Sequence, residues 1–141
     1  MITTSQYRHL DRTISEHLKT LTALHIADVR GQHTQALVDA TVVSWRNILV
    51  NLLELANPYQ NYCLTVEQHA EVLRMVQDVT TSAGVVETLR ERRIVAVEEG
   101  VGKTMMEVID KRLDTAKENR KIAYETFHNY MVNLLDFSAE E

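Results

Sequence analysis

The stretch Glu98-Glu99-Gly100-Val101-Gly102-Lys103-Thr104 decides the fold, because it separates two long segments whose apolar residues recur at three- and four-residue steps. A glycine that follows such a segment supplies the left-handed residue on which helices end. The sequence therefore predicts two long antiparallel helices, about 65–99 and 103–137, joined by a tight connection. Each would be about 50 Å long, a length typical of coiled-coil hairpins.

The same spacing predicts two shorter helices before this hairpin, about 4–30 and 33–56. Thr65 and Gln68 fit a capping box at the start of the third helix. The weak helix formers of residues 80–84 favour a continuous but weakened third helix, and a break there is the alternative. We expect a single all-α domain over residues 1–141, an elongated antiparallel four-helix bundle with two long coiled-coil-like C-terminal helices.

Composition narrows the class of protein. The chain has 141 residues and a net charge of -5, which argues against general binding to nucleic-acid phosphates. Cys63 is the single cysteine, and the N-terminus lacks the basic and apolar segments of a secretory signal. The sequence contains no run of about 18 consecutive apolar residues, so it predicts no membrane span. We expect a soluble protein of the cytoplasm with no membrane partner.

Charged and apolar residues are separated along the chain. Nine basic and eight acidic residues lie between Glu87 and Lys121, which predicts a solvated hairpin tip. The predicted second helix carries only three formal charges, so we expect it to be the most buried element. Apolar surface from this helix and from the end of the fourth predicts an interface made by Trp45, Leu49, Leu53, Tyr130 and Leu134.

The run from Ile94 to Thr104 resembles a phosphate-binding loop, because an apolar run precedes Gly102-Lys103-Thr104. The pattern lacks its first glycine, since Val97 stands there, and two glutamates would face the phosphate. No other segment suggests the parallel sheet on which such loops sit. A plain connection between two helices is the better interpretation.

Histidines raise the question of a metal site. His9, His17, His25 and His33 recur every eight residues, but that spacing separates neighbours by about 12 Å along a helix. Glu125 and His128 have the Glu-x-x-His spacing of di-iron bundles, although no second copy of the motif is present. Ordinary helix-surface histidines are therefore the expected outcome, and no metal ligand is assigned.

Cys63 and Ser44 stand in no recognisable activating context, so we assign no catalytic or cofactor-binding residue. The sequence predicts a non-enzymatic protein–protein interaction or assembly protein, such as a subunit, adaptor, inhibitor or chaperone-like accessory factor, that acts by helix packing. Its expected partners are further copies of itself, another protein, or both. The alternative is a small-ligand or metal-binding bundle that uses His128, Glu125 and Tyr124.

Overall fold

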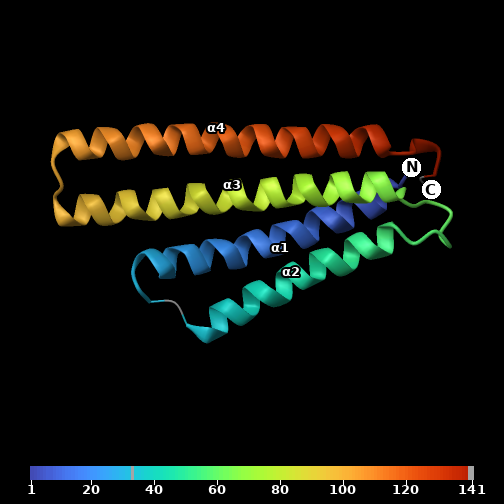
Figure 1. The fold of residues 1–141 in the computed structure, drawn as a ribbon, viewed down its shortest axis with the longest axis horizontal. Helices are drawn as coiled ribbons and strands as arrows, with labels where there is room; N and C mark the ends of the chain where they lie inside the picture. Colours follow the sequence, from blue (N-terminus) through green and yellow to red (C-terminus); the bar gives the residue numbers. More distant parts are fainter. Residues whose placement is uncertain (33, 140–141) are drawn as a thin grey trace.

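The computed structural model describes residues 1–32 and 34–139 and confirms the all-α bundle. Within these residues it contains four α-helices and a short 3-10 helix, η1 (Phe137–Ala139). The helices are α1 (Thr4–Val29), α2 (Gln35–Leu55), α3 (Val66–Glu99) and α4 (Lys103–Leu134) (Figure 1). His33, the predicted first residue of the second helix, lies outside the described residues.

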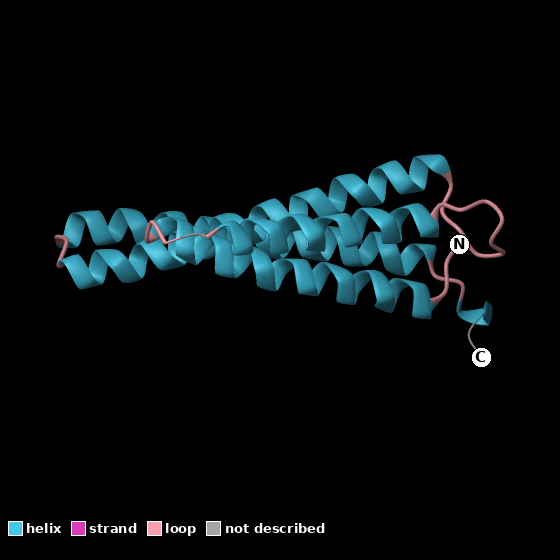
Figure 2. Ribbon diagram, turned by 90° about the horizontal axis from the view of Figure 1, so that it is seen from below, coloured by secondary structure: helices cyan, strands magenta, loops and turns pink. Residues whose placement is uncertain are grey.

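The helices lie side by side in the order α4, α3, α1 and α2 (Figure 1). α3 is the central helix, because it packs on α4 along one side and on α1 along the other. α2 packs mainly on α1 and touches α3 only slightly. Figure 2 shows that the connected ends of α3 and α4 project beyond the other helices. α2 is therefore an edge helix.

Local signals in the sequence explain where the helices begin and end. The predicted capping box is present, since the Gln68 amide donates to Thr65 Oγ1 at 3.1 Å and the Thr65 amide donates to Gln68 Oε1 at 2.9 Å. Gly100 ends α3 in the left-handed conformation with φ of 68°. A second capping box, formed by Thr3 and Gln6 at the start of α1, was not predicted.

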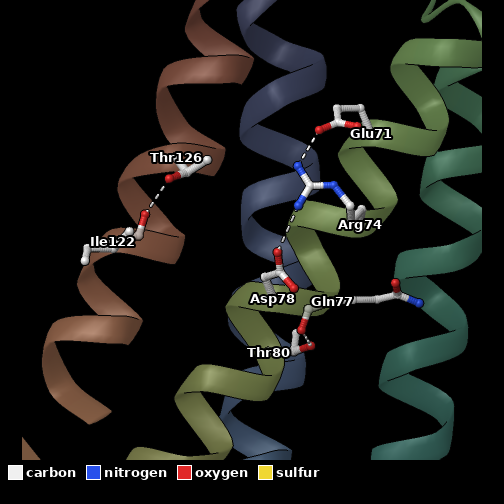
Figure 3. Close-up of polar contacts among 7 residues, drawn as sticks. All are labelled: Glu71, Arg74, Gln77, Asp78, Thr80, Ile122 and Thr126. Carbon is white, nitrogen blue, oxygen red and sulfur yellow. Dashed lines mark hydrogen bonds and ion pairs between the residues drawn. The ribbon is translucent and has the colours of Figure 1, made fainter. Parts of the chain in front are cut away.

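α3 continues without a break through residues 80–84, as the sequence favoured. Contact with the neighbouring helix α1 explains the glycine in this segment. A Cβ atom added to Gly84 would lie 2.7 Å from His25 Nε2, so the glycine lets α1 approach closely. Thr80 Oγ1 donates to the Gln77 carbonyl at 3.0 Å, which satisfies a buried hydroxyl inside the helix (Figure 3).

The main core lies at the end of the bundle that carries both termini. All four helices contribute to it, and Leu10, Ile48, Val76 and Phe127 are fully buried there. A smaller cluster of Val86, Leu113 and Ala116 joins α3 to α4. Towards the α1–α2 turn, α1 has no buried residue after His17. The two hairpins are thus well packed at one end only.

The C-terminus differs from the prediction. α4 ends at Leu134 rather than near residue 137, because the following backbone is extended and pairs with the N-terminus. The Ile2 amide donates to the Leu134 carbonyl at 2.9 Å, and the Asp136 amide donates to the Ile2 carbonyl at 2.8 Å. These bonds place the Ile2 side chain in the core, where it is fully buried.

Ion pairs join the end of α1 to the projecting hairpin and link α3 to α4 within it. Arg30, just after α1, donates to the buried carboxylate of Glu91 and lies 3.3 Å from Glu98. Across the hairpin, Arg93 Nε lies 2.5 Å from Asp110 Oδ1. The charges of the predicted solvated tip therefore include partners on different helices as well as on one helix surface.

Candidate functional site

The outer face of α2, which we define as Asp39, Val42, Val43, Arg46, Val50 and Leu53, consists of exposed residues, most of them apolar. At 100° per residue these positions fall opposite the buried side, which carries Ser44, Ile48, Leu52 and Leu55. Val42 and Val43 are each 51% exposed, Val50 is 48% exposed and Leu53 is 65% exposed. Four large apolar side chains thus share one uncovered face.

The prediction that α2 is the most buried helix is wrong. Its apolar residues occupy two faces, but α1 covers only one of them because α2 lies at the edge of the bundle. By length and composition alone, α2 is also long and apolar enough to cross a membrane, although its sequence contains no unbroken apolar run of that length. Only 17% of its most apolar 18-residue window is buried, so α2 does not behave as an ordinary core helix.

The five residues of the predicted interface lie in different environments. Leu53 is on the outer face, and Leu49 is half-buried beside it. Trp45 and Tyr130 are half-buried and pack against the core. Leu134 is buried in the core itself and is not part of the outer face of α2.

The predicted interface did not include three apolar residues of the outer face, Val42, Val43 and Val50. Their signal was present, because they are among the apolar residues of α2 that do not follow the core-facing three- and four-residue steps. An apolar residue outside these core-facing steps is exposed only if no other helix covers it. Which face of α2 is covered depends on the order in which the helices pack, and the spacing of apolar residues along the sequence does not give this order.

A buried polar cluster fixes the opposite side of α2 to α1. His17 is 4% exposed, and its Nδ1 atom lies 2.6 Å from Ser44 Oγ. Thr20 Oγ1 lies 2.8 Å from the same hydroxyl, and the Trp45 ring packs on His17 with 5.4 Å between ring centroids. The cluster orients α2 about its own axis, so that Val42 and Val43 face outward.

Burial lowers the pKa of His17 below its ordinary value of 6.5. The unfolded chain then binds more protons than the folded chain near and below pH 6.5. The His17 contribution to stability is therefore complete above pH 6.5 and is lost as the pH falls through the lower pKa of the folded state.

We expect urea unfolding to show this loss between pH 7.5 and pH 5, and the His17→Gln variant to lose stability less steeply over the same interval. His9, which is exposed, provides the matched control, and His9→Gln should keep the pH dependence of the original chain. Equal slopes for the original chain and His17→Gln would contradict this assignment.

A groove of about 620 Å³ opens where α2 diverges from α3. α1 provides its floor with His17, Leu21 and His25, and Trp45 forms the α2 wall. The α3 wall includes Arg92 at one end. His25 Nδ1 lies 3.2 Å from Thr88 Oγ1, so that ring nitrogen already has a partner within the chain.

The side chains of the alternative metal or ligand site serve other contacts. His128 Nδ1 lies 2.6 Å from the Tyr7 hydroxyl, and its ring stacks on Tyr124 with an interplanar angle of 5°. Burial raises the pKa of Tyr7, which keeps the phenol neutral. Glu125 is exposed. Among residues 1–32 and 34–139, no three His, Cys, Asp or Glu side chains are grouped so that they could hold a metal ion.

The exposed charges of α3 form ordinary helix-surface pairs. Arg74 lies between Glu71 and Asp78, donating to both, and its distance to Asp78 Oδ2 is 3.2 Å (Figure 3). On α4, Thr126 Oγ1 donates to the Ile122 carbonyl at 2.7 Å. These contacts satisfy the polar groups locally and leave the outer face of α2 as the candidate functional surface.

Comparisons with protein-family models, with curated proteins and with solved structures find no match to this chain.

Proposed function

We propose that this chain is a non-enzymatic assembly protein of the cytoplasm that acts by helix packing through the outer face of α2. It would serve as a subunit, adaptor, inhibitor or chaperone-like accessory factor. The observation that supports this proposal is the uncovered set of Val42, Val43, Val50 and Leu53 on a single edge helix. Full burial of one such side chain contributes roughly 1.5–3 kcal/mol, so covering the set would strongly favour association.

The geometry of α2 suits a helix-packing interface. The exposed apolar residues Val43, Val50 and Leu53 follow at steps of seven and three, with Val42 beside them, and form the ridge that a partner helix contacts. The His17–Ser44 cluster and the core side of α2 fix that ridge in place. A pre-ordered helix loses little conformational freedom when it binds, which makes a rigid face an efficient contact surface.

The experiment is sedimentation equilibrium of the original chain over a hundredfold concentration range. We expect a mass at least twice the 16.2 kDa of one chain. A Val43→Lys/Val50→Lys variant should fall to the mass of one chain, with a dissociation constant raised on the order of 100-fold or more, because lysines at a packed apolar contact lose solvation. Both positions are half exposed, so the variant should fold normally.

The matched control is Ile94→Lys/Val97→Lys on α3, where the side chains are 44% and 58% exposed. This control should leave the mass unchanged. A monomeric original chain would overturn self-assembly, and its flotation with lipid vesicles would assign α2 to a membrane surface instead. An equal loss of mass in both lysine variants would show that α2 has no special role.

A small-ligand function is the second candidate, and its location is the groove between α1, α2 and α3. The volume of about 620 Å³ lies in the usual range for ligand sites. Two histidines and Trp45 supply polar and aromatic contacts there. A native mass spectrum that shows one chain with added mass would favour this function over assembly.

A further inference from the structure

Two opposite charges lie on the outer face of α2 among its apolar residues. Asp39 and Arg46 are both exposed and lie seven residues apart, so they point to the same side of the helix. Arg46 forms no ion pair with any of the residues that the structure describes. Asp39 Oδ1 accepts a hydrogen bond from Gln35 Nε2 at 2.8 Å, which leaves its second oxygen available.

A partner that covers this face must therefore supply a negative group for Arg46 and a positive group for Asp39. A second copy of α2 carries both groups at the correct separation if it runs antiparallel. A parallel two-fold pair would place Arg46 against Arg46 of the partner subunit, which is repulsive. The antiparallel arrangement places unlike charges opposite each other twice, once for each copy.

We propose that two copies of the chain pack α2 on α2 in antiparallel orientation, with Asp39 of each copy opposite Arg46 of the partner subunit. This proposal rests on the assembly function proposed above and specifies its geometry. Positions whose numbers add up to 85 then face each other, so Val42 meets Val43 of the partner subunit beside the two-fold axis. The two valines of each copy form the centre of the contact, and the charge pairs flank it.

The competing antiparallel register pairs Arg46 with Glu54 of the partner subunit, so the numbers of facing positions add up to 100. Since α2 spans Gln35–Leu55, that register overlaps only positions 45–55, whereas the register through Asp39 overlaps positions 35–50. The longer overlap covers Val42, Val43 and Val50 and leaves Leu53 beyond the partner helix, whereas the shorter overlap covers Val50 and Leu53 but neither Val42 nor Val43. The longer overlap also uses the part of α2 that diverges from the rest of the bundle (Figure 1).

Charge reversal on the full chain tests this geometry. Asp39→Arg and Arg46→Asp each convert two attractive pairs into two repulsive ones, and each should raise the dissociation constant of the dimer about tenfold or more. An equimolar mixture of the two variants should associate as a heterodimer with an affinity near that of the original chain, because both charge pairs are then attractive again. Native mass spectrometry resolves the heterodimer by mass.

Glu54→Arg is the matched control, since it changes the net charge as Asp39→Arg does but lies outside the overlap. Its dissociation constant should stay within about twofold of the original value. Single variants that dimerise normally, or a mixture that forms no heterodimer, would overturn the register even if Val43→Lys/Val50→Lys dissociates the dimer and so supports the assembly function. A monomeric original chain would overturn self-assembly and, with it, this register.

Discussion

Replacing Phe127 by alanine should lower the free energy of unfolding by about 3–5 kcal/mol, the usual cost of removing a large buried aromatic side chain. Phe127 is fully buried in the core, and its ring meets Tyr7 edge-on with 6.1 Å between centroids. This contact joins α4 to α1, as does the 2.6 Å contact between the Tyr7 hydroxyl and His128 Nδ1. The substitution therefore removes apolar burial and a link between the two hairpins.

Urea unfolding followed by circular dichroism measures the effect. Phe127→Leu is the control, because it keeps most of the buried volume and should cost no more than about 1.5 kcal/mol. A loss below about 1 kcal/mol for Phe127→Ala would mean that α4 does not pack on the core as the structure shows, since so small a cost is typical of an exposed site.

Ile2→Ala should cost about 2–4 kcal/mol even though the residue stands near the end of the described chain. Ile2 is fully buried, and its backbone bonds to Leu134 and Asp136 fix it in place. The free energy of unfolding falls for two reasons, because the apolar burial of the removed carbon atoms is lost and because a cavity remains in their place. Ile2→Val is the graded control, with an expected cost of about 0.5–1.5 kcal/mol.

Amide hydrogen exchange gives an independent test of the contact between the termini. The Asp136 amide donates to the Ile2 carbonyl at 2.8 Å, so it should exchange slowly in the original chain and faster in Ile2→Ala. An Asp136 amide that exchanges at the rate of an open chain in both proteins would show that the N-terminal residues do not pair with the C-terminal turn.

α2 links the fold to the proposed function. A helix with apolar residues on two faces belongs either inside a protein or against a partner. The packing order places α2 at the edge, and α1 covers only its side with Ser44, Ile48 and Leu52. Covering the outer face with a partner helix reconciles the apolar composition of α2 with its position.

Much of the fold followed from the sequence, because local signals decide it. Gly100 ends α3, the Thr65–Gln68 capping box begins it, and apolar spacing sets the four helices. Each of these signals acts within a few residues of the chain. The sequence predicted only part of the candidate surface. Leu53 was among the predicted interface residues, whereas Val42, Val43 and Val50 were not.

The sequence by itself determined the helices, their caps and the apolar character of α2. Only the tertiary structure decided that α2 lies at the edge, that Leu134 is buried and that Ile2 ends α4 early by pairing with its last turn. The physical reason is that these outcomes depend on which helix faces meet. Such contacts join residues far apart in the chain, as Ile2 and Leu135 do, and periodicity within one segment carries no information about them.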